Sequence, residues 1–437
     1  MTRFVTHWLR ALPARPENSK NRCRQAAIFV LYYMRRFILF SRGVPRSKDQ
    51  KGGDPLKYWR GYLTAAIFAG FTYILTQLAQ KYSTLLDMVY PYVTRSVQGF
   101  LATWTGGLEV CLWQILLVLF VVAVLAALVI TIIFKRSIFQ WLGWVLACVS
   151  IVCFLNTGIY GLNEYNGPIE DDLRLEMVDY TRGELETAAE FYRDKANALA
   201  VQMPRDGQGN LIGADFAELA ESAGDGFRSL VMDRFFSIFG GDYTPVKELG
   251  WSGIYSSKGI TGYTCTLTGE AAVNPETPDQ GMPFAICREM AHRLCVARQE
   301  EANFAAFLAC EANEDPQFQY SAYLMAYRSC YQALSAVDSA AAARVRTGCA
   351  SELVWDLDNY DRFFSGKEEG TALSLTSFFG LSDVESESSF CDYLVSWYLD
   401  VYAEPPEEVV KFDPFDENQV DLSGIPNARP QETEESE

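Results

Sequence analysis

The chain has 437 residues and a formal net charge of −18, divided unevenly along its length. Residues 1–160 carry 18 basic against 5 acidic side chains, whereas residues 161–437 carry 19 basic against 50 acidic. The acidic C-terminal part repels a phosphate backbone, which excludes nucleic acid as a partner. The length of the chain leaves room for a membrane region and one sizeable domain.

Residues 1–58 form a basic segment that we expect to be cytoplasmic. Within it, the apolar run 26–40 is interrupted by Arg35 and Arg36 and is too short to span a bilayer. An interfacial helix with its arginines reaching toward the headgroups is therefore expected. No short apolar core precedes a small-residue cleavage site, so we expect no cleavable signal peptide.

Residues 59–163 contain three uncharged apolar runs that are long enough to cross a bilayer, which takes about 20 helical residues. These predicted spans cover about 62–79, 111–134 and 138–160. The first run is short and contains Thr64, Thr72 and Gln77, so a buried or interfacial helix is its alternative. The residues between the first two runs are interpreted as a connecting loop.

Basic residues predict the orientation of these spans. Fourteen lysines and arginines precede the first span, and Lys135 and Arg136 lie between the second and third. Only Lys81 and Arg95 lie between the first and second. The positive-inside rule then predicts a multi-pass protein of the cytoplasmic membrane with a cytoplasmic N-terminus and an extracytoplasmic domain over residues 164–403. The lipid bilayer is thus an expected partner.

Periodic patterns predict an α+β domain that is mostly helical. The segment 180–201 is an amphipathic helix in which Thr181 caps the start and Glu184 completes a capping box. Glycines punctuate the β-prone segment 251–273, which predicts two or three short strands. Further helices are predicted over 214–239, 283–296, 298–312, 317–336, 337–365 and 390–402.

The C-terminal residues 404–437 are acidic and rich in proline, and we expect them to be disordered. Seven cysteines follow residue 160, at wide and irregular spacings without a CxxC pair. They are Cys265, Cys287, Cys295, Cys310, Cys330, Cys349 and Cys391. Buried free thiols are favoured over disulfides or a metal site.

Arg288-Glu289-Met290-Ala291-His292 has the form of the zinc-protease motif HExxH with arginine in place of the first histidine. On a helix, positions 288 and 292 share a face and Glu289 lies about 100° away. In the intact motif two imidazoles hold zinc and the glutamate activates a water molecule. The chain's other histidine, His7, lies in the basic segment. Taken alone, this partial motif favours an amphipathic helix with a polar face formed by Arg288 and His292.

The motif helix and its neighbours resemble the uncharacterised bacterial membrane family known as domain of unknown function 3810. The resemblance covers roughly residues 60–400. It rests on Gly161-Leu162-Asn163, Leu267-Thr268-Gly269-Glu270-Ala271-Ala272-Val273-Asn274, Met282–His292 and Glu300-Glu301-Ala302-Asn303-Phe304. It implies three membrane helices followed by a zincin-like extracytoplasmic domain, in which a small sheet borders the motif helix.

The resemblance also implies roles for individual residues. Glu289 corresponds to the general base, His292 to the second zinc ligand, and Glu301 to the third ligand. Arg288 stands at the position of the first histidine, and Glu300 stands where the family usually has aspartate. An arginine cannot ligate zinc because its guanidinium stays protonated, so zinc binding is expected to be weak or absent.

Without zinc, Arg288 could bridge Glu289 and Glu301 through charge-assisted hydrogen bonds. The alternative is that Arg288 points outward and leaves the site vacant.

Three functions remain open. The favoured one is a catalytically silent metallopeptidase homologue that binds a peptide or an envelope protein or has a regulatory role. The second is an active zinc-dependent membrane peptidase that recruits Cys287, Cys310 or Glu270 as a non-standard ligand. The third is a structural membrane protein without catalysis.

Overall fold

The computed structural model describes residues 55–365 and 389–403. The chain divides into two compact units, Met1–Lys57 and Tyr58–Glu437. The predicted interfacial helix at 26–40 and the predicted disordered tail at 404–437 lie outside the described residues.

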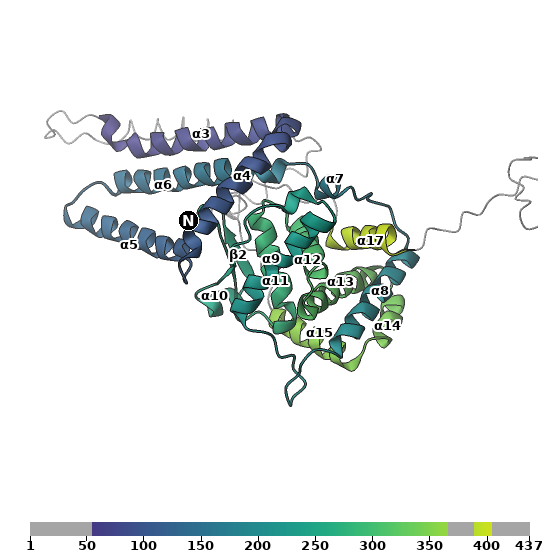
Figure 1. Cartoon of the computed structure of the whole chain (residues 1–437). Helices are drawn as coiled ribbons and strands as arrows, with labels where there is room; N and C mark the ends of the chain where they lie inside the picture. Colours follow the sequence, from purple (N-terminus) through teal and green to yellow (C-terminus); the bar gives the residue numbers. More distant parts are fainter. Residues whose placement is uncertain (1–54, 366–388, 404–437) are drawn as a thin grey trace, which may run out of the picture. The chain divides into compact units, whose positions relative to one another are not determined.

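Three helices are long and apolar enough to cross a membrane, and they coincide with the three predicted spans. They are α3 (Arg60–Lys81), α5 (Leu112–Ile133) and α6 (Ile138–Ile159). Helices α3 and α6 lie side by side (Figure 1) and are parallel, since Gly61 contacts Gly143 and Phe68 contacts Phe154. A Cβ at Gly61 would lie 2.4 Å from the backbone of Gly143, so glycine permits this close approach.

The connection between α3 and α5 is a helix, α4 (Ser83–Gly106), where we expected a loop. It contains Pro91, which obscures helical periodicity in the sequence. One face of α4 is buried through Thr94, Arg95, Gln98, Ala102 and Thr105. These side chains pack on the domain that follows the spans, so α4 belongs to that domain's structure although it precedes the last span.

The predicted helices after residue 160 are present, with small shifts at their ends. Thr181 caps α8 (Arg182–Ala200) in the expected capping box, because the Thr181 N–H donates to Glu184 and the Glu184 N–H donates to Thr181. The other helices are α7 (Ile169–Leu173), α9 (Phe216–Asp233), α10 (Ser252–Ser256), α11 (Met282–Arg293), α12 (Gln299–Glu311), α13 (Pro316–Val337), α14 (Ser339–Thr347), α15 (Ser351–Phe364) and α17 (Phe390–Val401). Short 3-10 helices cover Pro55–Tyr58, Gly161–Tyr165, Ser237–Phe239 and Asp279–Gly281.

The core lies where α8, α11, α12, α13 and α17 meet, and large aromatic side chains fill it. Tyr192, Phe304, Phe307, Phe318 and Tyr327 are all completely buried. Burying such a ring removes roughly 150–250 Å² from water, which makes these five side chains a main source of stability. The predicted free thiols are confirmed, because the cysteines of the described residues are all unpaired.

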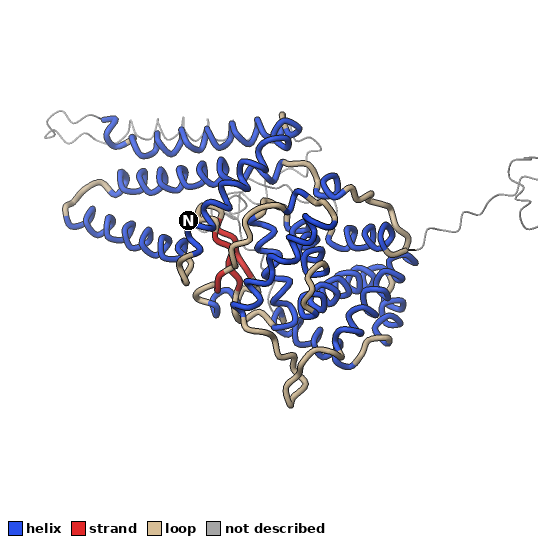
Figure 2. Tube along the Cα trace, viewed as in Figure 1, coloured by secondary structure: helices blue, strands red, loops and turns tan. Residues whose placement is uncertain are grey.

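A three-stranded sheet lies against α11 (Figure 2). Its strands are β1 (Lys247–Glu248), β2 (Gly262–Cys265) and β3 (Glu270–Val273), in the order β1-β3-β2. β3 pairs parallel with β1 and antiparallel with β2. The predicted strand region was too broad, since its first residues form α10 and β1 precedes it. The α+β class and the sheet beside the motif helix are confirmed.

Candidate functional site

Helix α11 carries the motif, and its sequence divides it into two faces. Pro283 stands in the first turn, where backbone N–H groups have no acceptor within the helix, so the lack of an N–H in proline costs no helical hydrogen bond. Ile286, Cys287 and Met290 are completely buried in the core. The motif side chains lie on the other side, next to the residues that lead into β2.

Arg288 and Glu289 form an ion pair, with Arg288 Nη2 3.0 Å from Glu289 Oε1. The same Arg288 nitrogen donates to the Thr261 hydroxyl at 2.8 Å, and the Thr264 hydroxyl donates to Glu289 Oε2 at 2.9 Å. Glu289 is only 3% exposed, so both oxygens of a buried carboxylate are satisfied from within the protein. A Cβ at Gly262 would lie 2.5 Å from Glu289 Cγ, which explains why this strand position is glycine.

The His292 ring is bonded to the backbone at the end of the motif helix. Its Nδ1 lies 2.9 Å from the Val296 carbonyl oxygen, which can only accept, so Nδ1 carries the hydrogen. Burial lowers the pKa of His292 below its ordinary value, and Arg288 adds to that effect while Glu289 opposes it. The Tyr160 hydroxyl donates to the His292 backbone carbonyl at 2.7 Å and ties the helix to the end of the last span. A neutral imidazole is the form that binds metals.

Glu301 is engaged by a different arginine. Its Oε1 accepts from the Arg298 guanidinium and, at 3.4 Å, from the Ile169 N–H. Glu301 is 5% exposed, and burial raises the pKa of its carboxyl to about 7, against the opposing effect of Arg298. Arg288 therefore pairs with Glu289 as expected, whereas the expected contact between Arg288 and Glu301 is wrong. Arg298 precedes Glu301 by three residues, so the two side chains lie one helical turn apart and can pair directly.

The remaining candidate residues have structural partners. Glu300 accepts from the Phe390 N–H at 2.9 Å and so caps the start of α17. Leu112 and Trp113 are the first two residues of α5, and their N–H groups donate to the Glu270 carboxylate at 2.8 and 3.0 Å. Lys247 Nζ lies 2.7 Å from the same Glu270 carboxylate. Glu270 is thus the cap of a membrane-length helix, a role that no local sequence signal indicates.

Cys287 and Cys310 are completely buried next to each other in the core. Burial raises the pKa of the Cys310 thiol, and the neighbouring Cys287 adds to the rise. The thiolate is the form that binds a metal, and burial disfavours it at Cys310.

These donors do not fit a catalytic zinc ion, which usually takes three protein ligands. In residues 55–365 and 389–403, no group of three or more His, Cys, Asp or Glu side chains could hold a metal ion. The position of the first imidazole is occupied by a cation, and the two carboxylates are already paired with arginines.

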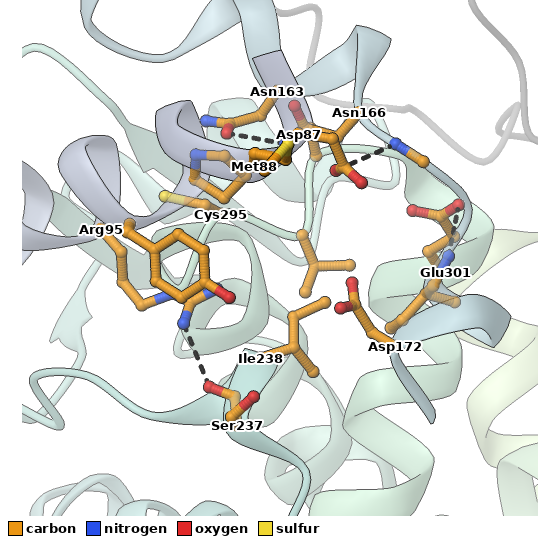
Figure 3. A pocket seen from close by; sticks show the side chains of 16 residues that line it. Asp87, Met88, Arg95, Asn163, Asn166, Asp172, Ser237, Ile238, Cys295 and Glu301 are labelled. Atoms are coloured by element: carbon orange, nitrogen blue, oxygen red, sulfur yellow. Dashed lines mark hydrogen bonds between the residues drawn. The ribbon is translucent and has the colours of Figure 1, made fainter. Parts of the chain in front are cut away.

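A cavity of about 320 Å³ lies between α4, the segment after the last span, and the turn from α11 to α12. Figure 3 shows Arg95 and Glu301 on different sides of it, with Asp172 between them. Glu301 lines this cavity, whereas Arg288, Glu289 and His292 do not. Sequence reasoning missed Arg95, which donates to the carbonyl oxygens of Leu294 and Ser237 at 3.2 and 3.1 Å, because α4 was interpreted as a loop.

A family model described as "Protein of unknown function (DUF3810)" matches residues 86–379 of this chain. No curated protein and no solved structure matches the chain.

Proposed function

This chain belongs to the DUF3810 family of proteins of unknown function, and we propose that it is a membrane-anchored, zincin-like domain without catalytic activity. Its role in this proposal is to bind a peptide or an envelope protein at the cell surface. The single observation that carries the proposal is the ion pair between Arg288 and the buried Glu289.

The ion pair is incompatible with the chemistry of the intact motif. A general base must accept a proton from a metal-bound water, yet one Glu289 oxygen is held by Arg288 and the other by Thr264. The Arg288 guanidinium also puts a permanent positive charge beside the position that zinc would take, which repels a second cation. In this proposal the motif helix is therefore a structural element of the domain.

The active-peptidase alternative would need another ligand in place of the lost histidine. Cys287 and Cys310 are in the core, and Glu270 is bonded to the start of α5 and to Lys247, so none of the three supports the active-peptidase alternative.

Binding of a labelled peptide library to the full chain separates a binding role from that of a purely structural membrane protein, which would bind no peptide selectively.

Metal content tests the proposal directly. We expect the full chain, purified in detergent without chelators, to hold far less than one zinc per molecule and to hydrolyse no peptide. Glu289→Gln and His292→Ala should leave the metal content unchanged, because neither residue holds zinc in the native protein. Stoichiometric zinc that is lost in His292→Ala would contradict the proposal. Arg288→His combined with Arg298→Gln should raise zinc affinity, since it supplies an imidazole and releases Glu301.

The proposal also places the N-terminus in the cytoplasm and the domain outside the cytoplasmic membrane. Three crossing helices require the two to be on opposite sides. Reporter fusions after Lys51 and after Asp206 should give a cytoplasmic and an extracytoplasmic signal, respectively. Signals from the same side would show that one of the three helices does not cross.

A further inference from the structure

The outward face of α4 is mostly apolar, with Ser96 and Thr103 as its polar residues, although this helix is not one of the three that could cross a membrane. Phe100 and Trp104 expose 71% and 70% of their surface. Six exposed apolar side chains recur there at helical spacing and are called the α4 stripe: Leu85, Val89, Val93, Val97, Phe100 and Trp104. Met88 and Tyr92 stand at the edge of this face and also line the cavity between α4 and the domain. The stripe contains no charged residue, so water is an unfavourable environment for it.

The opposite face of α4 is fixed to the domain, so the stripe cannot turn inward. Arg95 donates to the carbonyl oxygens of Leu294 and Ser237, and the Gln98 amide donates to the Thr266 carbonyl at 2.8 Å. Near the end of the helix, the Thr103 hydroxyl donates to Asp242 at 2.8 Å. Arg95 and Gln98 are buried, and their bonds fix the rotation of α4 about its axis, which leaves the α4 stripe pointing away from the domain.

Both ends of α4 are joined to helices of membrane length. Only Tyr82 separates it from α3, and residues 107–111 separate it from α5. Because α3 and α6 are parallel, α3 ends on the side on which α6 ends and on which the domain begins. If the three helices cross a bilayer, α4 is held at the membrane surface on the domain's side.

We propose that α4 is an interfacial helix, with the α4 stripe inserted among the lipid acyl chains of the leaflet on the domain's side. A helix of 24 residues is about 36 Å long, enough to lie along that surface under the domain. Tryptophan, as at Trp104, favours the boundary between headgroups and acyl chains. The bilayer is favoured over a second copy of the chain as the partner of the α4 stripe. The flanking helices already place the stripe at the membrane, so its insertion does not cost the entropy that is lost when two chains associate.

Photo-crosslinking of the full chain in vesicles of phosphatidylethanolamine and phosphatidylglycerol tests this inference. Benzoylphenylalanine would replace Trp104 in one variant and Phe100 in a second, in case the first variant fails to fold. Leu119, exposed on α5, is the positive control, and Trp355, which is 42% exposed on α15, is the matched tryptophan control. Unfolding midpoints equal to that of the native chain establish that each variant is folded.

Lipid adducts at position 104 or 100 comparable to those at 119, and none at 355, are the expected result. Crosslinked dimers in place of lipid adducts would show that a second copy covers the α4 stripe and would overturn the inference. Lipid adducts at 119 but none at 104 and 100 would also overturn it, because the stripe would then lie in water or against another protein. Neither outcome depends on zinc, so this test is independent of the proposed loss of catalysis.

Discussion

Arg288→Ala should lower the free energy of unfolding of the full chain by about 2–3 kcal/mol. The substitution leaves the Glu289 carboxylate buried with only the Thr264 hydroxyl as a side-chain partner. Breaking a fully buried pair costs roughly 3–5 kcal/mol, and we reduce that figure because the Arg288 side chain is 19% exposed. Chemical unfolding in detergent, followed by circular dichroism, measures the change.

Two further variants separate the ion pair from a general effect of losing an arginine. Arg344 forms a 2.7 Å ion pair with Glu186 on the surface, so Arg344→Ala should change stability by less than ~1 kcal/mol. Adding Glu289→Gln to Arg288→Ala removes the unpaired charge and should recover part of the loss. An Arg288→Ala protein as stable as the native chain would instead mean that the pair contributes nothing and that solvent satisfies Glu289.

Glu270→Ala should have a larger effect, a loss of about 3–5 kcal/mol. It removes the acceptor of two N–H groups at the start of α5 and leaves the Lys247 ammonium without its carboxylate partner. Glu270 is 2% exposed, so water cannot easily replace the lost bonds. The unfolding midpoint of the full chain in detergent reports the loss, and a large drop in folded protein in the membrane would accompany it.

The matched control is Glu248, a glutamate on the neighbouring strand β1 whose side chain is exposed. Glu248→Ala should change stability by no more than ~0.5 kcal/mol. Equal effects of the two substitutions would argue against a capping role for Glu270. Lys247→Met combined with Glu270→Leu offers a further check, because it removes both charges together and should be milder than Glu270→Ala alone.

Local signals in the sequence were sufficient for most of the secondary structure. The three spans follow from uninterrupted apolar runs, and α8 follows from the capping box of Thr181 and Glu184. The motif helix was predicted from its periodic pattern, and the sheet beside it was predicted from the glycine-punctuated segment and the family resemblance. Helix α4 was missed because Pro91 and the polar residues of its buried face conceal its periodicity.

The partners of the charged residues could not be predicted, because they depend on tertiary contacts. Glu270 and Leu112 are 158 residues apart, and nothing in either local sequence indicates that they meet. Arg298 competes with Arg288 for Glu301, and only the path of the chain between α11 and α12 decides which arginine reaches it. Residue types and spacing therefore identified the site residues as candidates without assigning them their roles.

Strand β3 has a mechanical consequence. Its first residue, Glu270, holds the start of α5, and its last residue, Val273, is buried in the core cluster that includes α11. Gly269, just before it, has a φ of +67°, and a Cβ there would lie 2.8 Å from the backbone nitrogen of Ala102 in α4. Strand β3 thus joins the start of α5 to the core, and it also pairs with β2, whose Thr264 donates to Glu289. We therefore expect a change in the tilt of α5 to shift the sheet that holds the Glu289 carboxylate.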